Sequence, residues 1–260
     1  MTPALAAVGL LFGGALLGAV RSSLRSDPLG ELGPEAWWWL LRSPGLVDSF
    51  VFSARVAVLA TLLSAGLAAA VGAMLRTRGA LVRGLFAFPV LVPHLVVAAV
   101  AVLWLGPGGI ADRLLGGLPL QVVRDRAGLG VVLVYLYKEV PFLVLVVLAS
   151  WREAVAEREE AAAVLGAGPW QRFRWVVWPA IRAPLVAGSL IVAAFAFGSF
   201  EVPLVVGPTH PPTLAVFALE TAKSADPAGL ARAAAVLLFT ALAALLAALA
   251  ALPRAWGGDA

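Results

Sequence analysis

The sequence predicts an all-α, polytopic membrane protein with six transmembrane helices and a single permease-like domain over residues 1–260. Composition is the first reason, because 62% of the residues are hydrophobic, 13% are charged and the mean hydropathy is +0.95. A soluble domain is about 45–50% apolar and about 25% charged, and disorder requires low hydrophobicity. The other two reasons are a set of long apolar runs and one charged segment that interrupts them.

A helix needs about 20 mostly apolar residues to cross about 30 Å of hydrocarbon. The first apolar run lacks the basic stretch that opens a signal peptide, so we interpret it as a span. A transmembrane β-barrel would show alternating segments of about 10 residues, whereas these runs are continuous. The six predicted spans are Ala4–Val20, Val51–Leu75, Leu85–Leu105, Gly128–Trp151, Pro184–Val206 and Leu230–Leu252.

Charge and motif content exclude several function classes. The net charge is +4, and most charged residues lie in short stretches between apolar runs, which fits membrane flanks and not nucleic-acid binding. Cysteine is absent, so the sequence offers no disulfide framework. The two lysines, Lys138 and Lys223, do not follow a phosphate-binding loop. We therefore expect no cofactor, no metal site and no ATPase site in this chain; a partner would bind ATP and Mg²⁺.

The segment between the fourth and fifth spans, residues 152–183, is amphipathic and highly charged. Its first part predicts a helix over Arg152–Leu165, with a left-handed C-cap at Gly166. A second short helix is expected over Trp170–Trp178, ending before Pro179. Apolar and acidic residues recur on separate faces of the first helix: Ala154, Val155, Ala161, Ala162 and Leu165 on one, and Glu153, Glu157 and Glu160 on another. Such a helix is suited to docking in a groove of a partner.

The same segment resembles the EAA loop of permease subunits of binding-protein-dependent ABC importers, whose pattern is E-A-A-x3-G-x9-I-x-L-P. The matching residues are Glu160, Ala161, Ala162, Gly166 and Pro179, with Val176 in place of isoleucine and Trp178 in place of leucine. Tyr137 with Pro141-Phe142 is similar to the Y-x-x-x-P-F of polyamine-type permeases. The resemblance extends over roughly residues 85–249.

The resemblance implies one half of a translocation pathway in the plasma (inner) membrane of a prokaryote, with both termini in the cytoplasm. The implied partners are two ABC ATPase subunits, a second permease (a homologue or a second copy), an external substrate-binding protein and membrane lipid. It also implies that Glu160, Ala161, Ala162, Gly166, Val176 and Pro179 form the ATPase-coupling contacts. The implied substrate is a polyamine or another small cationic or neutral solute; sugars, thiamine, anions and metal complexes stay open.

Ionisable residues inside spans cost about 2.5–3.5 kcal/mol each to insert and are functional candidates by default. His94, Lys138 and Glu139 fall near the midplane at a rise of about 1.5 Å per residue, and Glu201 falls in the outer third of the fifth span. We expect these four residues to line a pathway. The alternatives are structural contacts: Lys138 and Glu139 with the partner permease, and His94 with a carbonyl freed by Pro93.

Two other functions compete with the importer. An ion-coupled secondary transporter would use Lys138, Glu139 and Glu201 as a relay, and an integral scaffold would carry no solute. Neither needs a docking helix. Residues 152–183 could instead be a basic membrane anchor, but an anchor does not explain their clustered glutamates or the E-A-A-x3-G spacing. The motif therefore favours the importer.

Overall fold

The computed structural model describes residues 2–25, 32–117, 120–151 and 153–256, which form helices joined by short loops and contain no strand. The first half comprises α1 (Thr2–Ser23), α2 (Glu35–Arg42), α3 (Pro44–Leu75), α4 (Ala80–Ala87), the 3₁₀-helix η1 (Phe88–Leu91), α5 (His94–Leu105) and α6 (Ile110–Leu115). The second half comprises α7 (Leu129–Ser150), α8 (Glu153–Val164), α9 (Pro169–Arg172), the π-helix η2 (Phe173–Val177), α10 (Trp178–Gly198), α11 (Glu201–Val206), α12 (Leu214–Ala222) and α13 (Gly229–Trp256).

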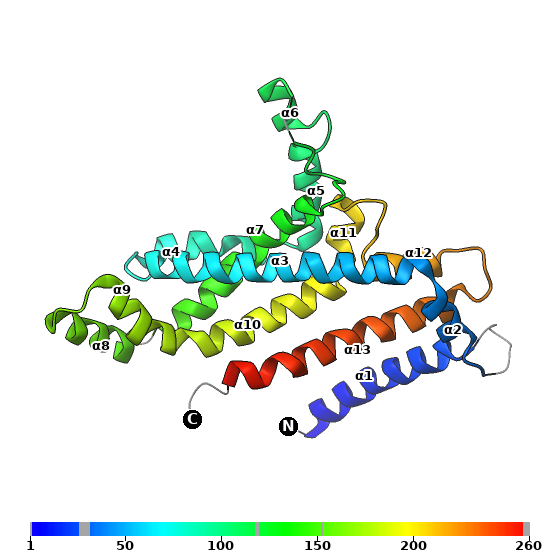
Figure 1. The fold of residues 1–260 in the computed structure, drawn as a ribbon, viewed down its shortest axis with the longest axis horizontal. Helices are drawn as coiled ribbons and strands as arrows, with labels where there is room; N and C mark the ends of the chain where they lie inside the picture. The colour runs from blue at the N-terminus through cyan, green and yellow to red at the C-terminus, as the bar shows by residue number, and fades with distance from the viewer. Residues whose placement is uncertain (1, 26–31, 118–119, 152, 257–260) are drawn as a thin grey trace.

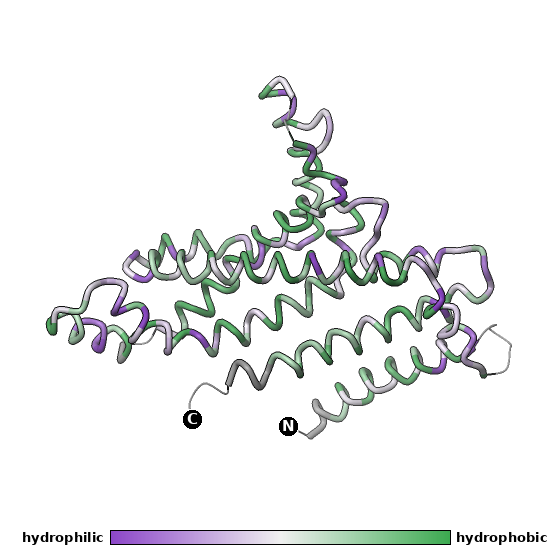
Figure 2. Tube along the Cα trace, viewed as in Figure 1, coloured by the Kyte–Doolittle hydropathy of each residue, from purple (hydrophilic) through white to green (hydrophobic). Residues whose placement is uncertain are grey.

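Six helical segments in the described residues are long and apolar enough to span a membrane, which confirms the predicted number. Hydrophobic residues follow the long helices, while hydrophilic residues gather at the loops and around α8 (Figure 2). We call the end of the bundle that carries α8 and α9 the α8 end; α2 and α12 lie at the opposite end (Figure 1). α1 begins and α13 ends on the side facing the α8 end, so the first and last spans run in opposite directions.

The core is centred on α3, α7 and α10, which pack against one another. Further buried apolar residues come from α2, α5, α11, α12 and α13. Small residues allow the close approach of α3, α7 and α10. A Cβ at Gly72 of α3 would lie 2.7 Å from Cγ1 of Val147, and one at Gly188 of α10 would lie 2.9 Å from a methyl group of Leu143. These two contacts set α7 between α3 and α10 and fix the frame to which the α8 end is attached.

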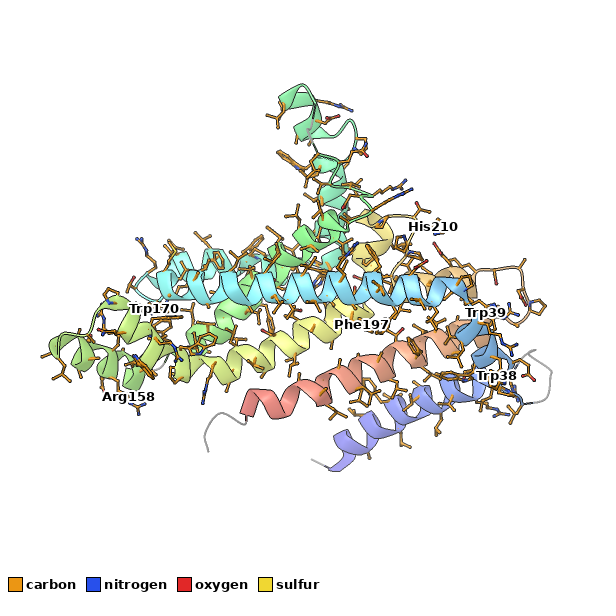
Figure 3. All side chains as sticks on the ribbon, in the orientation of Figure 1. Trp38, Trp39, Arg158, Trp170, Phe197 and His210 are labelled. Atoms are coloured by element: carbon orange, nitrogen blue, oxygen red, sulfur yellow. The ribbon has the colours of Figure 1, made fainter. Side chains whose placement is uncertain are left out.

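The peripheral α1 lies beside α13 (Figure 1), and its apolar side chains are mostly exposed within this single chain. At the α2 end, Trp39 stacks on Phe217 of α12 with ring centroids 5.9 Å apart, and the Arg232 guanidinium lies 5.0 Å from the Trp39 ring. Trp38 points outward from the same helix and is exposed (Figure 3). This arrangement suits an amphipathic helix at a membrane surface.

The predicted continuous third span over Leu85–Leu105 is wrong. The chain runs as α4 and η1, leaves helical geometry at Val92, and restarts as α5 after Pro93. Proline has no N–H and disfavours helix in the residue before it, and Val92 is indeed extended, with φ −80° and ψ 128°. α4 packs on α7, whereas α5 and α6 project away from the bundle (Figure 1).

The fifth span also differs from the predicted Pro184–Val206. α9, η2 and α10 follow one another without a break, so the apolar helical segment covers Pro169–Gly198. The predicted stop before Pro179 does not occur, because Trp178 is helical (φ −55°, ψ −46°). Proline lacks an N–H, and here it follows directly on the change from the π-helix η2 to α10. Pro184 lies inside α10, and α11 is a separate short helix.

Candidate functional site

The first candidate site is the segment from α8 to η2, which begins where α7 ends at Trp151; Arg152, the predicted first residue of this segment, lies outside the described residues. α8 turns Val155 and Glu159 inward, and both are buried. The Glu159 carboxylate forms an ion pair with the guanidinium of Arg76, the residue that follows α3. The Arg76 guanidinium also lies 4.5 Å from the centre of the Trp151 ring. α8 is thereby attached to the ends of α3 and α7.

Gly166 ends α8 as predicted, with a left-handed φ of +88°. Its N–H donates to the carbonyl of Ala163 at 3.0 Å, and the N–H of Ala167 donates to the carbonyl of Ala162 at 2.9 Å. This pair of bonds is the Schellman arrangement, which satisfies carbonyls at a helix end. A residue with a Cβ is strained at such a φ. Glycine therefore fixes the turn between α8 and α9.

The tip of this segment exposes apolar side chains. Val164 and Leu165 are 88% and 87% exposed, and Trp170 and Trp175 are 71% and 72% exposed. The acidic side chain of Glu160 is exposed next to them. Trp170 and Arg158 mark this tip at the α8 end (Figure 3). An apolar patch with a charged rim is the composition of a protein-docking surface.

The structure brings together three of the residues predicted for coupling. Ala162, Gly166 and Val176 line one cavity of about 410 Å³ between α8 and the α9–η2 helix. Glu160 lines a different cavity of about 330 Å³, which it shares with Arg76. Ala161 is exposed on the outer face of α8, and Pro179 lies apart at the start of α10.

The second candidate site lies at the break in the third span. The Lys138 ammonium, buried on α7, donates to the carbonyl oxygens of Pro89, Val90 and Val92 at 2.7, 3.1 and 2.5 Å. These carbonyls lie at the end of η1, where the helix stops; the Pro89 carbonyl also accepts the N–H of Val92 at 3.2 Å. A cation at the carbonyl end of a helical segment also complements its dipole. Lys138 therefore closes the end of η1.

The adjacent Glu139 holds the other side of the same break. Its Oε1 lies 3.0 Å from Nε2 of His94, the first residue of α5, in a hydrogen bond. The His94 ring also packs on Phe195 of α10, with ring centroids 4.6 Å apart. The structure thus unites His94, Lys138 and Glu139, and all three find partners within this chain. Their predicted role in lining a pathway stays a prediction.

Glu201 does not join this cluster through a hydrogen bond or ion pair among the described residues. It is exposed at the first position of α11, beyond the end of α10. Its predicted place within the fifth span is wrong, because that helix ends at Gly198.

Sequence reasoning missed two charged residues that the structure makes prominent. Arg55, inside the predicted second span, donates to the carbonyls of Arg126 and Ala127 at 3.0 Å each and so ties α3 to the start of α7. An arginine within an apolar run was the available signal. The second missed residue is Glu159. It lies four residues after the apolar Val155 and therefore shares the face of α8 that packs on this chain.

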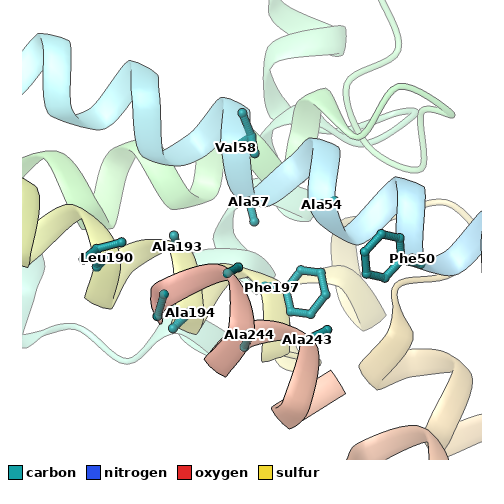
Figure 4. A pocket seen from close by; sticks show the side chains of 12 residues that line it. Phe50, Ala54, Ala57, Val58, Leu190, Ala193, Ala194, Phe197, Ala243 and Ala244 are labelled. Carbon is teal, nitrogen blue, oxygen red and sulfur yellow. The ribbon is translucent and has the colours of Figure 1, made fainter. Parts of the chain in front are cut away.

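A further cavity of about 260 Å³ lies among α3, α10 and α13 and is lined by apolar side chains, mostly alanines with Phe50 and Phe197 (Figure 4). The two phenyl rings meet edge to face, with centroids 5.9 Å apart. This cavity offers no polar side chain for recognising a charged solute. We do not include it in the candidate site.

The fold and site define a multi-pass α-helical membrane protein with a charged helix, α8, between two of its spans. The family model for binding-protein-dependent transport system inner membrane components matches residues 63–252, and the chain belongs to this family. It is 31% identical over 187 residues to the inner membrane ABC transporter permease protein YdcU of Escherichia coli K12, covering 65% of this chain and 60% of YdcU.

Two other relatives are named for particular transported solutes. The chain is 30% identical over 169 residues to the molybdenum transport system permease protein ModB of Mycobacterium tuberculosis, covering 63% of each chain. It is 33% identical over 112 residues to the sulfate transport system permease protein CysW of Escherichia coli K12, covering 43% of this chain and 38% of CysW. The chain thus spans less than two thirds of the length of these relatives.

A solved structure has the same fold. A bacterial ABC transporter involved in the import of the acidic polysaccharide alginate contains a chain that superposes with a TM-score of 0.81 at 16% identity, covering 99% of this chain and 94% of that one. At this identity the match establishes the fold alone.

Proposed function

We propose that this chain is a transmembrane subunit of an ATP-driven importer, forming half of a solute pathway and receiving its driving force from a cytoplasmic ATPase. The observation that carries the proposal is the tip of the α8–η2 segment, where Val164, Leu165 and Trp170 are exposed beside Glu160. Membership of the binding-protein-dependent family supports it. ATP and Mg²⁺ would bind to the ATPase and not to this chain.

The proposed assembly contains two ATPase subunits, a second permease and an external binding protein. A second solved structure of an alginate ABC transporter matches this chain with a TM-score of 0.79 at 16% identity. It is a complex with a periplasmic protein that carries an alginate pentasaccharide, which supports the binding-protein arrangement by analogy of fold. With α8 against the ATPase, the α8 end faces the cytoplasm. α1 then starts and α13 ends on the cytoplasmic side.

We propose a small charged solute as the cargo. The resemblance around Tyr137, Pro141 and Phe142 favours a polyamine, whereas the names of the relatives ModB and CysW point to molybdenum and sulfate. Competition for uptake by spermidine, molybdate and sulfate separates these classes, since only the transported class should compete at low concentration.

The test of the proposed function is reconstitution of this chain into vesicles with its partner permease, ATPase and binding protein. Solute uptake should require ATP on the side of the membrane that carries the ATPase and loaded binding protein on the opposite side. The chain alone should show no uptake, with or without a proton or sodium gradient. Gradient-driven uptake by the chain alone would replace the importer with the secondary transporter.

A further inference from the structure

We propose that Arg76 and Glu159 form a strut that transmits movement of α8 to the transmembrane core, making both of them positioning residues for transport. The inference rests on the proposed function, because it concerns how an ATPase docked on α8 would move the spans. It assigns a role to two residues that lie outside the E-A-A-x3-G motif.

The first step is the direction in which α8 turns its glutamates. Glu159 is buried and faces Arg76, whereas Glu157 and Glu160 are exposed. Adjacent residues on a helix point about 100° apart, so one glutamate of the pair 159–160 can face the core while the other faces a partner. α8 is therefore a two-sided element, with a docking face and an anchoring face.

The second step is what the anchoring face joins. Arg76 follows the last turn of α3, and its guanidinium contacts Glu159 of α8 and the ring of Trp151 at the end of α7. α8 itself packs chiefly on α9 and η2. One side chain thus connects the docking helix with two of the three helices on which the core is centred.

The third step is rigidity. The Glu159 side chain is 11% exposed and that of Arg76 is 31% exposed, so solvent screens the pair less than it would a surface pair. Stacking on Trp151 restricts the guanidinium further. α3 continues from this point for 32 residues through the bundle in contact with α7 and α10. A displacement of α8 is consequently passed to α3 instead of being absorbed in the 152–183 segment.

The test compares Arg76→Gln, Glu159→Gln, the conservative Arg76→Lys, and the exchanged pair Arg76→Glu with Glu159→Arg, each in the complete reconstituted transporter. Three quantities are measured per assembled complex: bound ATPase, stimulation of ATP hydrolysis by loaded binding protein, and solute imported per ATP hydrolysed. Arg78→Gln and Glu220→Gln are the controls, since both side chains are exposed and neither belongs to a proposed contact.

Both neutral variants should retain bound ATPase, because the docking face is intact, yet import per ATP should fall at least about tenfold, the scale on which loss of one partner of a buried ion pair acts. Arg76→Lys and the exchanged pair should recover most of the coupling. Unchanged import per ATP in both neutral variants overturns the proposal, as does a fall only in the amount of complex.

If neither neutral variant assembles, the variant with the exchanged pair decides. Assembly with normal import per ATP supports the strut. Assembly without coupling, or failure to assemble, contradicts it. Failure of the proposed function is separate, since the wild-type complex would then show no ATP-driven uptake at all.

Discussion

Glu139 and His94 meet across the break in the third span, with 3.0 Å between Oε1 and Nε2, and the preceding residue Lys138 holds the other side of the same break. Two consecutive residues of α7 thus fasten η1 and α5, which the chain does not join by regular helix. Because unpaired backbone carbonyls are costly inside a membrane, these contacts allow a non-helical turn there.

Removing the Lys138 ammonium should destabilise the chain. Lys138→Met removes the side-chain donor that the carbonyls of Pro89, Val90 and Val92 share, and only the Pro89 carbonyl keeps the N–H of Val92. An unsatisfied buried polar group costs about 1–3 kcal/mol. Thermal unfolding of the purified protein in detergent should occur at a lower temperature than in the wild type. Lys223→Met, at an exposed position, is the control. Equal unfolding temperatures would show that Lys138 does not support the break.

Glu139→Gln separates charge from hydrogen bonding, because the amide keeps the size of the side chain and can still bond His94. We expect normal assembly of the transporter and reduced uptake if Glu139 lines the pathway. Glu139→Leu, which also loses the bond, should reduce the amount of assembled protein. Wild-type uptake by the Gln variant would assign Glu139 a structural role alone.

Arg55→Leu should loosen the connection between α3 and the start of α7. It removes two bonds that one nitrogen of the exposed Arg55 guanidinium donates to carbonyls. A hydrogen bond from a charged group contributes about 1.5–3 kcal/mol, and we expect a total loss near the lower figure because the site is exposed. A loss of stability on this scale should appear as a lower unfolding temperature, whereas the exposed Arg78→Leu should have little effect. A stable Arg55→Leu protein would mean that water replaces the lost donor.

The orientation can be read by labelling, because the chain has no cysteine. Single cysteines introduced at Thr77 or Arg172 should be protected in intact cells from a membrane-impermeant thiol reagent. Cysteines at Arg42, Arg113 or Pro211 should react. Labelling at Arg172 from outside would place α8 on the wrong side for an ATPase.

The number of spans could be predicted from the sequence, because each long apolar run is a local property of the chain. The breaks at Pro93 and Gly198 could not be placed, since apolar composition is the same in a continuous and a broken helix. At Pro179 the sequence predicts a helix end that the structure does not have, because the chain passes from the π-helix η2 into α10 without leaving helical geometry.

The spacing within residues 152–183 predicts a helix with a left-handed cap, and the φ of Gly166 confirms the cap. Docking of this helix on an ATPase stays a prediction. The helical spacing groups Ala161 and Leu165 with Val155 on one apolar face, yet the first two are exposed and Val155 is buried. A docking helix carries apolar residues on both faces, so periodicity alone does not identify the face that packs on its own chain. The face that packs on this chain is the one that contacts Arg76, and this residue lies 83 positions before Glu159, so the contact is visible only in the structure.

The most direct test of the central claim, that α8 and its glycine cap couple this chain to an ATPase, is solute uptake and ATP hydrolysis measured together in vesicles. Gly166→Val places a Cβ at a φ of +88°, at a cost of about 1 kcal/mol or more. Glu160→Lys reverses an exposed charge on the docking face. Gly166→Asn, which tolerates the left-handed region, should retain more activity than Gly166→Val.

Both Gly166→Val and Glu160→Lys should insert into the membrane normally, because neither residue lies in an apolar span. The account predicts that both lose uptake, with the ATPase either dissociated or hydrolysing ATP without response to the loaded binding protein. Wild-type uptake with normally stimulated ATP hydrolysis in both variants would contradict it.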